Sequence, residues 1–173
     1  MNNFSKKIEN ISNKNLTVFI DAVEEYVISP KTTERISDIT KNVLNVYNKI
    51  PSVYCTSLFL INEDNYDFEH KASNPSEYSE ESILNFEFLV ENGYLGTSLQ
   101  TGKVIVTMDE NYEESQKEHI IIPLVVSWGI IGLIIVTGKN YSGDLSNILL
   151  KLSAIMGNIF ASNLERINVY QKL

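Results

Sequence analysis

The sequence predicts an α+β domain in which helices cover one face of a mostly antiparallel sheet. Apolar residues recur every three or four positions in the first 50 residues, which is typical of amphipathic helices. After Pro51 the spacing changes to two, as in half-buried strands, and the helical spacing returns from about residue 145 to the end. The 173 residues and the 43 % hydrophobic content are enough for one domain with its own core.

Two helices are expected before the first strand. Residues 1–15 are polar, and we expect them to form a flexible end. A helix should follow within residues 16–31, because an apolar stripe ends just before Pro30. Thr32 or Thr33 is expected to cap a second helix that ends near Pro51.

The middle of the chain predicts a hairpin, a short helix and a short strand. Residues 53–61 are rich in β-branched and aromatic residues, and residues 66–73 alternate like their hairpin partner. Residues 82–91 fit a strand or a helix equally well, so their structure is left open. A short helix is expected between Gly93 and Gly102, followed by a strand over residues 103–107 and an acidic loop.

The strongest local signal is a pair of apolar runs over residues 119–139, separated by Ser127, Trp128 and Gly129. These runs predict a tight hairpin at the centre of the sheet, buried on both faces. The apolar stripe of the last helix is still running at Leu173, which predicts that the chain is part of a longer protein.

Composition excludes several classes of protein. The net charge of −8 opposes a phosphate backbone and argues against nucleic acid as a partner. Ten of the 22 acidic residues lie within residues 77–118, and we interpret them as a solvated face. A single cysteine, Cys55, rules out an internal disulfide, and neither a signal peptide nor a membrane span is apparent. We therefore expect a cytoplasmic protein.

Three segments together resemble the GAF domain family of small-molecule sensor modules. They are the glycine-bounded NGYLGTSLQTGKVIV, the hairpin IIIPLVVSWGIIGLIIV and the final helix that ends in ASNLERINVYQKL. The likeness extends over residues 32–173. It implies a five- to six-stranded sheet, with the N- and C-terminal helices on one face and a roof of short helices and loops over a ligand pocket on the other.

The resemblance places the roof at about residues 75–119, and the ligand beneath it. We expect the aromatic residues Phe86, Phe88, Tyr94 and Tyr112 and the imidazole of His119 to line the pocket, because aromatic side chains suit a planar or apolar ligand. The amides of Gly96, Thr97 and Ser98 are candidates for an anion or carbonyl clamp. The ligand itself, and any cofactor, stay unknown.

Other chemistries have weaker support in the sequence. The catalytic relatives of this fold reduce methionine sulfoxide with several cysteines, and bilin photoreceptors of the family need a cysteine on the roof. The single cysteine of this chain, Cys55, is instead expected on the first strand, as a buried apolar residue. The stretch TGKNYSGD departs from the signature of cyclic-nucleotide binders, with Gly138 in place of an asparagine. His70 and His119 lack the short spacing of a metal site, even with Asp109, Glu113 and Glu118 nearby, so no metal is expected.

The leading hypothesis is a non-enzymatic regulatory domain of bacterial signalling type, which binds a small molecule and shifts its terminal helices to control an output domain in the same or a partner chain. The alternative is a dimerisation scaffold with a filled pocket. We expect a homodimer through the terminal helices, because one sheet face should not bury both apolar stripes entirely. Ile159, Leu164 and Ile167 are placed near its axis, and Gly157 suggests a close helix contact there.

Overall fold

The computed structural model describes residues 16–27, 35–50, 52–109, 117–139 and 147–172. These residues form a five-stranded sheet in the order β2-β1-β5-β4-β3, and every neighbouring pair is antiparallel. The strands are β1 (Val53–Ile61), β2 (Phe68–Asn74), β3 (Ile105–Asp109), β4 (Lys117–Val126) and β5 (Gly129–Lys139). The predicted fold class is therefore confirmed.

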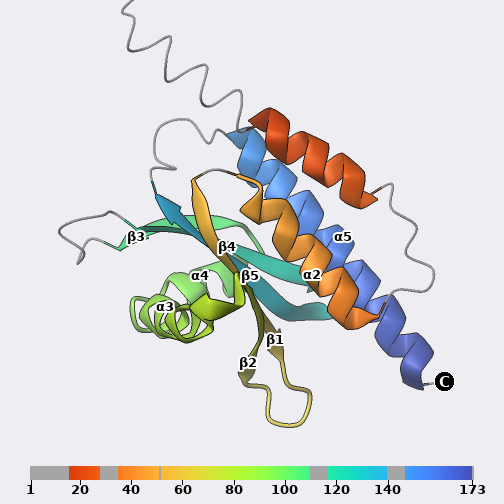
Figure 1. Cartoon of the computed structure of the whole chain (residues 1–173). Helices are drawn as coiled ribbons and strands as arrows, with labels where there is room; N and C mark the ends of the chain where they lie inside the picture. The colour runs from red at the N-terminus through yellow and green to blue at the C-terminus, as the bar shows by residue number, and fades with distance from the viewer. Residues whose placement is uncertain (1–15, 28–34, 51, 110–116, 140–146, 173) are drawn as a thin grey trace, which may run out of the picture.

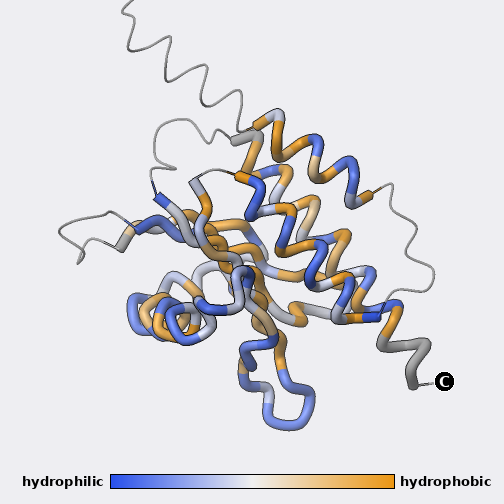
Figure 2. The backbone as a smooth tube through the Cα atoms, viewed as in Figure 1, coloured by the Kyte–Doolittle hydropathy of each residue, from blue (hydrophilic) through white to orange (hydrophobic). Residues whose placement is uncertain are grey.

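The helices divide between the two faces of the sheet (Figure 1). A helix over residues 16–27, α2 (Ile36–Asn48) and α5 (Asn147–Lys172) lie over one face, which we call the helix-bundle face. The short helices η1 (Ser76–Tyr78), α3 (Ser79–Glu91) and α4 (Tyr94–Thr101) belong to the opposite side, which we call the α3 face. Figure 2 shows apolar residues concentrated along the central strands, whereas the β1–β2 loop is polar.

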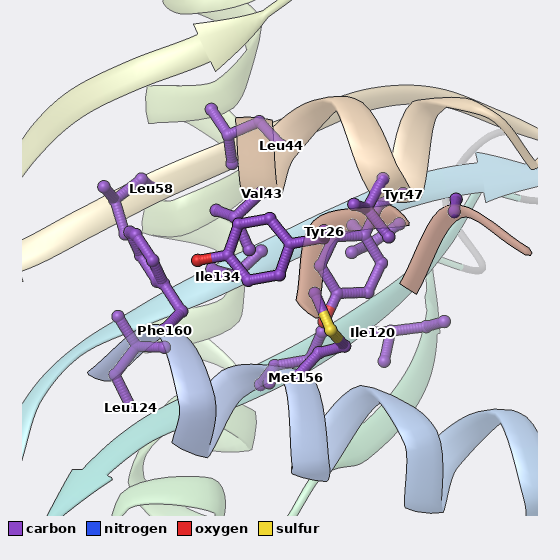
Figure 3. Close-up of a cluster of buried hydrophobic side chains, with 14 of the residues drawn as sticks. Tyr26, Val43, Leu44, Tyr47, Leu58, Ile120, Leu124, Ile134, Met156 and Phe160 are labelled. Atoms are coloured by element: carbon purple, nitrogen blue, oxygen red, sulfur yellow. The ribbon is translucent and has the colours of Figure 1, made fainter. Parts of the chain in front are cut away.

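The core of the helix-bundle face joins all three long helices to the sheet. Phe19, Tyr47, Met156 and Phe160 are fully buried there, and the rings of Phe19 and Tyr47 are 5.4 Å apart. The Tyr47 hydroxyl donates to the carbonyl of Ser153 at 3.3 Å, and burial raises the pKa of this tyrosine. Figure 3 shows Tyr26 of the first helix among side chains of α2, α5 and the strands.

Both terminal helices therefore bury part of their apolar stripes within one chain. The first helix packs Phe19, Ala22 and Tyr26 into the same core as α5. The stripes are nevertheless not buried entirely, as expected, because Ile20, Val27 and Ile155 remain exposed. Leu164 is only 2 % exposed and belongs to this core, so it is not available to a second copy in this arrangement. Ile159 and Ile167 are partly buried against the same core.

Gly157 also makes its close contact within the chain. A Cβ atom at this position would lie 2.8 Å from Cγ2 of Ile122 and 3.5 Å from the carbonyl oxygen of Pro123, both on β4. The glycine thus allows α5 to approach the sheet closely, and not a second copy as the sequence suggested.

The local predictions have mixed outcomes. The strand over residues 53–61, the hairpin that turns at Ser127 and Trp128, and the short helix between Gly93 and Gly102 are all present. Both of these glycines have positive φ, 75° and 64°, which an L residue rarely adopts. The predicted start of the second strand is wrong, because Tyr66 has φ 62° and lies in the loop before β2.

The N-terminus of α2 also differs from the expectation. Arg35 is its N-cap residue, and its N–H donates to the Asp38 carboxylate at 3.4 Å. A carboxylate in the first turn satisfies a backbone donor that the helix leaves unpaired, as in a capping box. Thr32 and Thr33 lie outside the described residues.

Residues 82–91, left open by the sequence, belong to helix α3. The buried residues of this helix are Ser82, Asn85 and Leu89, which follow the spacing of a helix. Two of the three are polar, which explains why hydropathy alone did not reveal the helical face. Within the described residues, no helix combines the length and the hydropathy needed to cross a membrane.

Candidate ligand-binding face beneath α3 and α4

The alternation of side chains along the strands decides which residues point toward α3 and α4. Ile120 and Ile122 of β4 join the core of the helix-bundle face, whereas Ile121 points to the α3 face. Leu133 and Ile135 of β5 also point to the α3 face. The α3 face therefore contains a second apolar cluster, whose buried members are Phe59, Leu89, Leu95, Ile121, Leu133 and Ile135.

A polar row crosses this face at the end near the start of β4. Strand register pairs Cys55 with Thr137, Thr137 with His119, and His119 with Thr107, so the row runs across four strands. All four residues are buried. Within the row, His119 Nδ1 and Thr137 Oγ1 lie within hydrogen-bond distance, at 3.1 Å. Polar side chains that face inward in an otherwise apolar layer carry a desolvation cost unless they are hydrogen-bonded, so this row differs in kind from the apolar cluster beside it.

The aromatic residues predicted for the pocket divide into two groups. The Phe88 ring lies 6.1 Å from the His119 ring and 6.4 Å from the Tyr94 ring, so these three predicted residues lie together beside the polar row. Phe86 instead stacks on Phe59 at 4.5 Å, within the apolar cluster. Tyr112 lies outside the described residues.

The predicted clamp on α4 is only partly available. The amide of Thr97 donates to the carbonyl of Gly93 at 3.2 Å, and its hydroxyl donates to the same oxygen at 3.1 Å. The Ser98 hydroxyl donates to the carbonyl of Lys103 at 2.8 Å and is fully buried, so it fixes the end of α4. Gly96 is exposed, with open space around its Cα. The Thr97 amide is thus already used within the helix, and a clamp formed by the three amides stays a prediction.

A chain of hydrogen bonds that the sequence did not reveal joins β2 to β1 through α3. His70 Nε2 lies 2.7 Å from Ser73 Oγ, which donates to Ser82 Oγ at 2.9 Å, and Ser82 Oγ lies 3.4 Å from Cys55 Sγ. Burial raises the pKa of the Cys55 thiol, although the hydrogen bond between Cys55 and Ser82 opposes this shift, and burial lowers the pKa of His70. Cys55 is therefore a buried, poorly ionised thiol, as expected from its place on the first strand.

An ion pair closes the same end of the face. Lys117 Nζ lies 2.7 Å from Glu81 Oε1, and this contact ties α3 to the start of β4. Tyr54 lies near the pair, and its pKa is raised by burial and then by the negative charge of Glu81. Both partners are partly shielded from solvent, so salt should weaken this pair less than a fully exposed one.

The residues weighed for a metal site do not gather in the structure. His70 lies on β2 and contacts Ser73, whereas His119 lies on β4 and contacts Thr137. Among the described residues, no group of three His, Cys, Asp or Glu side chains could hold a metal ion. Glu113 lies outside those residues.

The five-stranded antiparallel sheet, with long helices on one face and short helices on the other, matches the fold of solved GAF domains. Solved structures are similar to this chain at low sequence identity. A GAF domain of a phosphoenolpyruvate-protein phosphotransferase from Coxiella burnetii has a TM-score of 0.61 and 11 % identity, covering 94 % of this chain and 99 % of that one. A GAF domain/HD domain protein from Geobacter sulfurreducens has a TM-score of 0.60 and 12 % identity, covering 82 % and 99 %.

A GAF domain of an Acinetobacter phosphoenolpyruvate-protein phosphotransferase has a TM-score of 0.53 and 17 % identity, covering 87 % of this chain and 94 % of that one. No protein-family model matches the sequence, and the search of curated proteins found no match. At these identities the likeness establishes the fold, and the site must be argued from its own residues.

Proposed function

We propose that this domain is a non-enzymatic regulatory module of a signal-transduction protein, and that it binds a small molecule between the sheet and helices α3 and α4. The observation that carries the proposal is the buried polar row in which His119 lies beside the Phe88 ring, with the Tyr94 ring next to Phe88. A face that only had to pack α3 and α4 would need no such row, because apolar residues would fill it at lower cost. One of the similar GAF domains belongs to a phosphotransferase and another to a protein that also has an HD domain, which supports a regulatory role.

The side chains at this end of the face suit a planar ligand with a polar edge. Phe88 and Tyr94 offer ring surfaces, and His119 and Thr137 offer a nitrogen and a hydroxyl that already meet at 3.1 Å. Rings bind the flat face of a ligand, whereas the imidazole and hydroxyl recognise its hydrogen-bonding edge. We expect the specificity to come from these two polar residues.

Strand β4 offers a route from this site to the terminal helix. His119 points to the α3 face, and Ile122, three residues later, points to the opposite face and contacts the α5 position Gly157. The sheet is closely packed on both sides, so a shift of β4 at His119 would move the strand under α5. We propose that α5 carries this shift to an output domain in the same or a partner chain.

Native mass spectrometry of the purified protein tests the proposal. We expect an additional small-molecule mass on the parent protein, lost in Phe88→Ala and kept in Val106→Ala, a matched variant on the exposed edge strand β3. If no preparation carries such a mass and no metabolite mixture raises the thermal midpoint, the alternative of a scaffold with a filled pocket is favoured.

The homodimer stays a prediction, with different contact residues. Among the described side chains of the terminal helices, Ile20, Val27 and Ile155 are large apolar residues that remain 42–51 % exposed. We propose that these residues, with the partly buried Ile159 and Ile167, form the contact with a second copy. Sedimentation velocity of the parent and of Ile155→Asp tests this contact.

A further inference from the structure

A hollow of about 700 Å³ lies on the other side of the molecule from α3 and α4. It is bounded by the start of α2, the β1–β2 loop, the β4–β5 turn and the C-terminal half of α5. Ile61 at the end of β1 and Ile130 near the start of β5 are among the apolar residues that line it. None of the residues of the proposed α3-face site lines it, so any ligand here would occupy a second site.

Two large aromatic side chains stand exposed at the rim of this hollow. Trp128 is 67 % exposed at the β4–β5 turn, and Tyr66 is 80 % exposed in the β1–β2 loop. Two exposed aromatic residues that line one hollow form a surface that a ligand would cover. Their rings also carry a negative face that attracts cations.

The backbone at Tyr66 supports a role for its ring. The loop is held by its own hydrogen bonds, from the amide of Asp64 to the side chain of Asn62 at 2.8 Å and from the amide of Asp67 to that of Asn65 at 3.0 Å. These bonds fix a turn in which Tyr66 has φ 62°, a conformation usual for glycine or asparagine and unfavourable for tyrosine. The backbone conformation of the loop therefore disfavours tyrosine at position 66, where glycine would be unstrained. This strain supports a role for the side chain, which glycine would not provide.

The charge of the hollow has one sign. Glu165 of α5 accepts a hydrogen bond from Trp128 Nε1 at 2.7 Å, and Glu63 also lines the hollow. Of the described residues that line it, none is a lysine, an arginine or a histidine. The hydrogen bond to Glu165 holds the indole beside a carboxylate, so that a cation near the ring would meet both groups.

We propose that this hollow binds an organic cation of the alkylammonium class, with its charged head between Trp128, Tyr66 and Glu165 and its aliphatic tail along Ile61 and Ile130. Aromatic rings and a carboxylate recognise a quaternary or alkylated ammonium group, which is too weakly hydrated to prefer water strongly. The ligand would bridge the β4–β5 turn and α5, the two elements that the Trp128–Glu165 hydrogen bond already joins.

Titration with hexyltrimethylammonium tests the proposal, with hexanol and hexanoate as matched probes that share the tail. Trp128 is the only tryptophan in the chain, so its fluorescence reports on this hollow directly. We expect a saturable change with the cation, and binding at least ~5-fold weaker for hexanol and hexanoate. Equal binding of all three probes would indicate nonspecific hydrophobic binding of the hexyl chain and would overturn the proposal.

Three variants locate the site by calorimetry. Tyr66→Gly should weaken binding roughly 5-fold while the thermal midpoint stays the same or rises, because glycine accepts positive φ. Glu165→Gln, which keeps the side-chain shape, should weaken it by a similar factor, whereas Leu84→Ala, an exposed position on α3, should leave it unchanged. Parent-like affinity in both Tyr66→Gly and Glu165→Gln would contradict the proposal. So would a dimer in sedimentation that dissociates when the cation is added, because a second copy of the chain would then occupy the hollow.

Discussion

Replacing Gly157 by alanine should destabilise this domain, although alanine is the better helix former. Gly157 lies in the middle of α5 (Asn147–Lys172), where glycine costs about 1 kcal/mol relative to alanine. The new Cβ would lie 2.8 Å from Cγ2 of Ile122, closer than two carbon atoms can approach without a shift. Ile122 is fully buried and β-branched, so its side chain cannot easily turn away.

The size of the effect follows from two opposed contributions. Overpacking a well-filled core costs about 1–3 kcal/mol, and the gain in helix propensity offsets about 1 kcal/mol of that. We expect a net loss of about 1 kcal/mol in the free energy of unfolding, or a thermal midpoint roughly 2–4 °C lower for a domain of this length. Truncating the obstructing side chain should remove the penalty, so Gly157→Ala in an Ile122→Ala background should be neutral or stabilising.

Gly96→Ala is the matched control. This glycine also lies in a helix, α4, but it is exposed and nothing lies within 4 Å of the added Cβ. Near the start of a short helix we expect a gain of about 0.5 kcal/mol. Urea and thermal denaturation followed by circular dichroism measure both variants. If Gly157→Ala is as stable as the parent, or if both substitutions change stability in the same direction, the close approach of α5 to β4 is wrong.

Three further predictions follow from burial. Leu164→Asp should lower the free energy of unfolding by at least ~3 kcal/mol and unfold much of the protein, because it places a carboxylate in the core. Ile155→Asp, on the exposed side of α5, should leave the circular dichroism spectrum unchanged and should reduce the sedimentation coefficient if the homodimer forms there. Burial lowers the pKa of His70 from 6.5, so the unfolded chain binds the proton more readily and the free energy of unfolding should fall as the pH decreases through about 6.5. Urea titrations at one pH above and one pH below 6.5 measure this fall, which His70→Gln should reduce. Cys55 should react with iodoacetamide at least ~100-fold more slowly in the folded protein than in urea, because its thiol is buried and its pKa raised, and rapid labelling of the folded protein would contradict this placement.

Local sequence information was sufficient for most secondary structure. The alternation of residues 53–61 is a property of neighbouring residues, and β1 has those bounds. Gly93 and Gly102 mark the ends of α4 because positive φ is a local requirement that the residue type itself meets. Helix α3 was the exception, since two of its three buried residues, Ser82 and Asn85, are polar and hide the apolar face.

The candidate site depended more on tertiary structure. Phe88, Tyr94 and His119 could be named from the sequence, because aromatic residues in the middle of the chain and a histidine at the start of an apolar strand stand out. Thr137 and Thr107 could not, although a hydroxyl at an inward position of an apolar strand is a signal that could have found them. Their alignment with His119 depends on strand register, which hydrogen bonds between distant segments determine.

The sequence by itself determined the fold class, because periodicity and turn residues are local properties that each segment carries alone. Tertiary structure decided where each apolar stripe is buried, and this is why Leu164 lies in the core of its own chain and not at a dimer axis. It also decided the hollow beside Trp128, which joins residues from Ile36 to Glu165. The physical reason is the same in both cases: burial and shape arise from contacts between residues far apart in the chain, and no short segment contains the information about its partner.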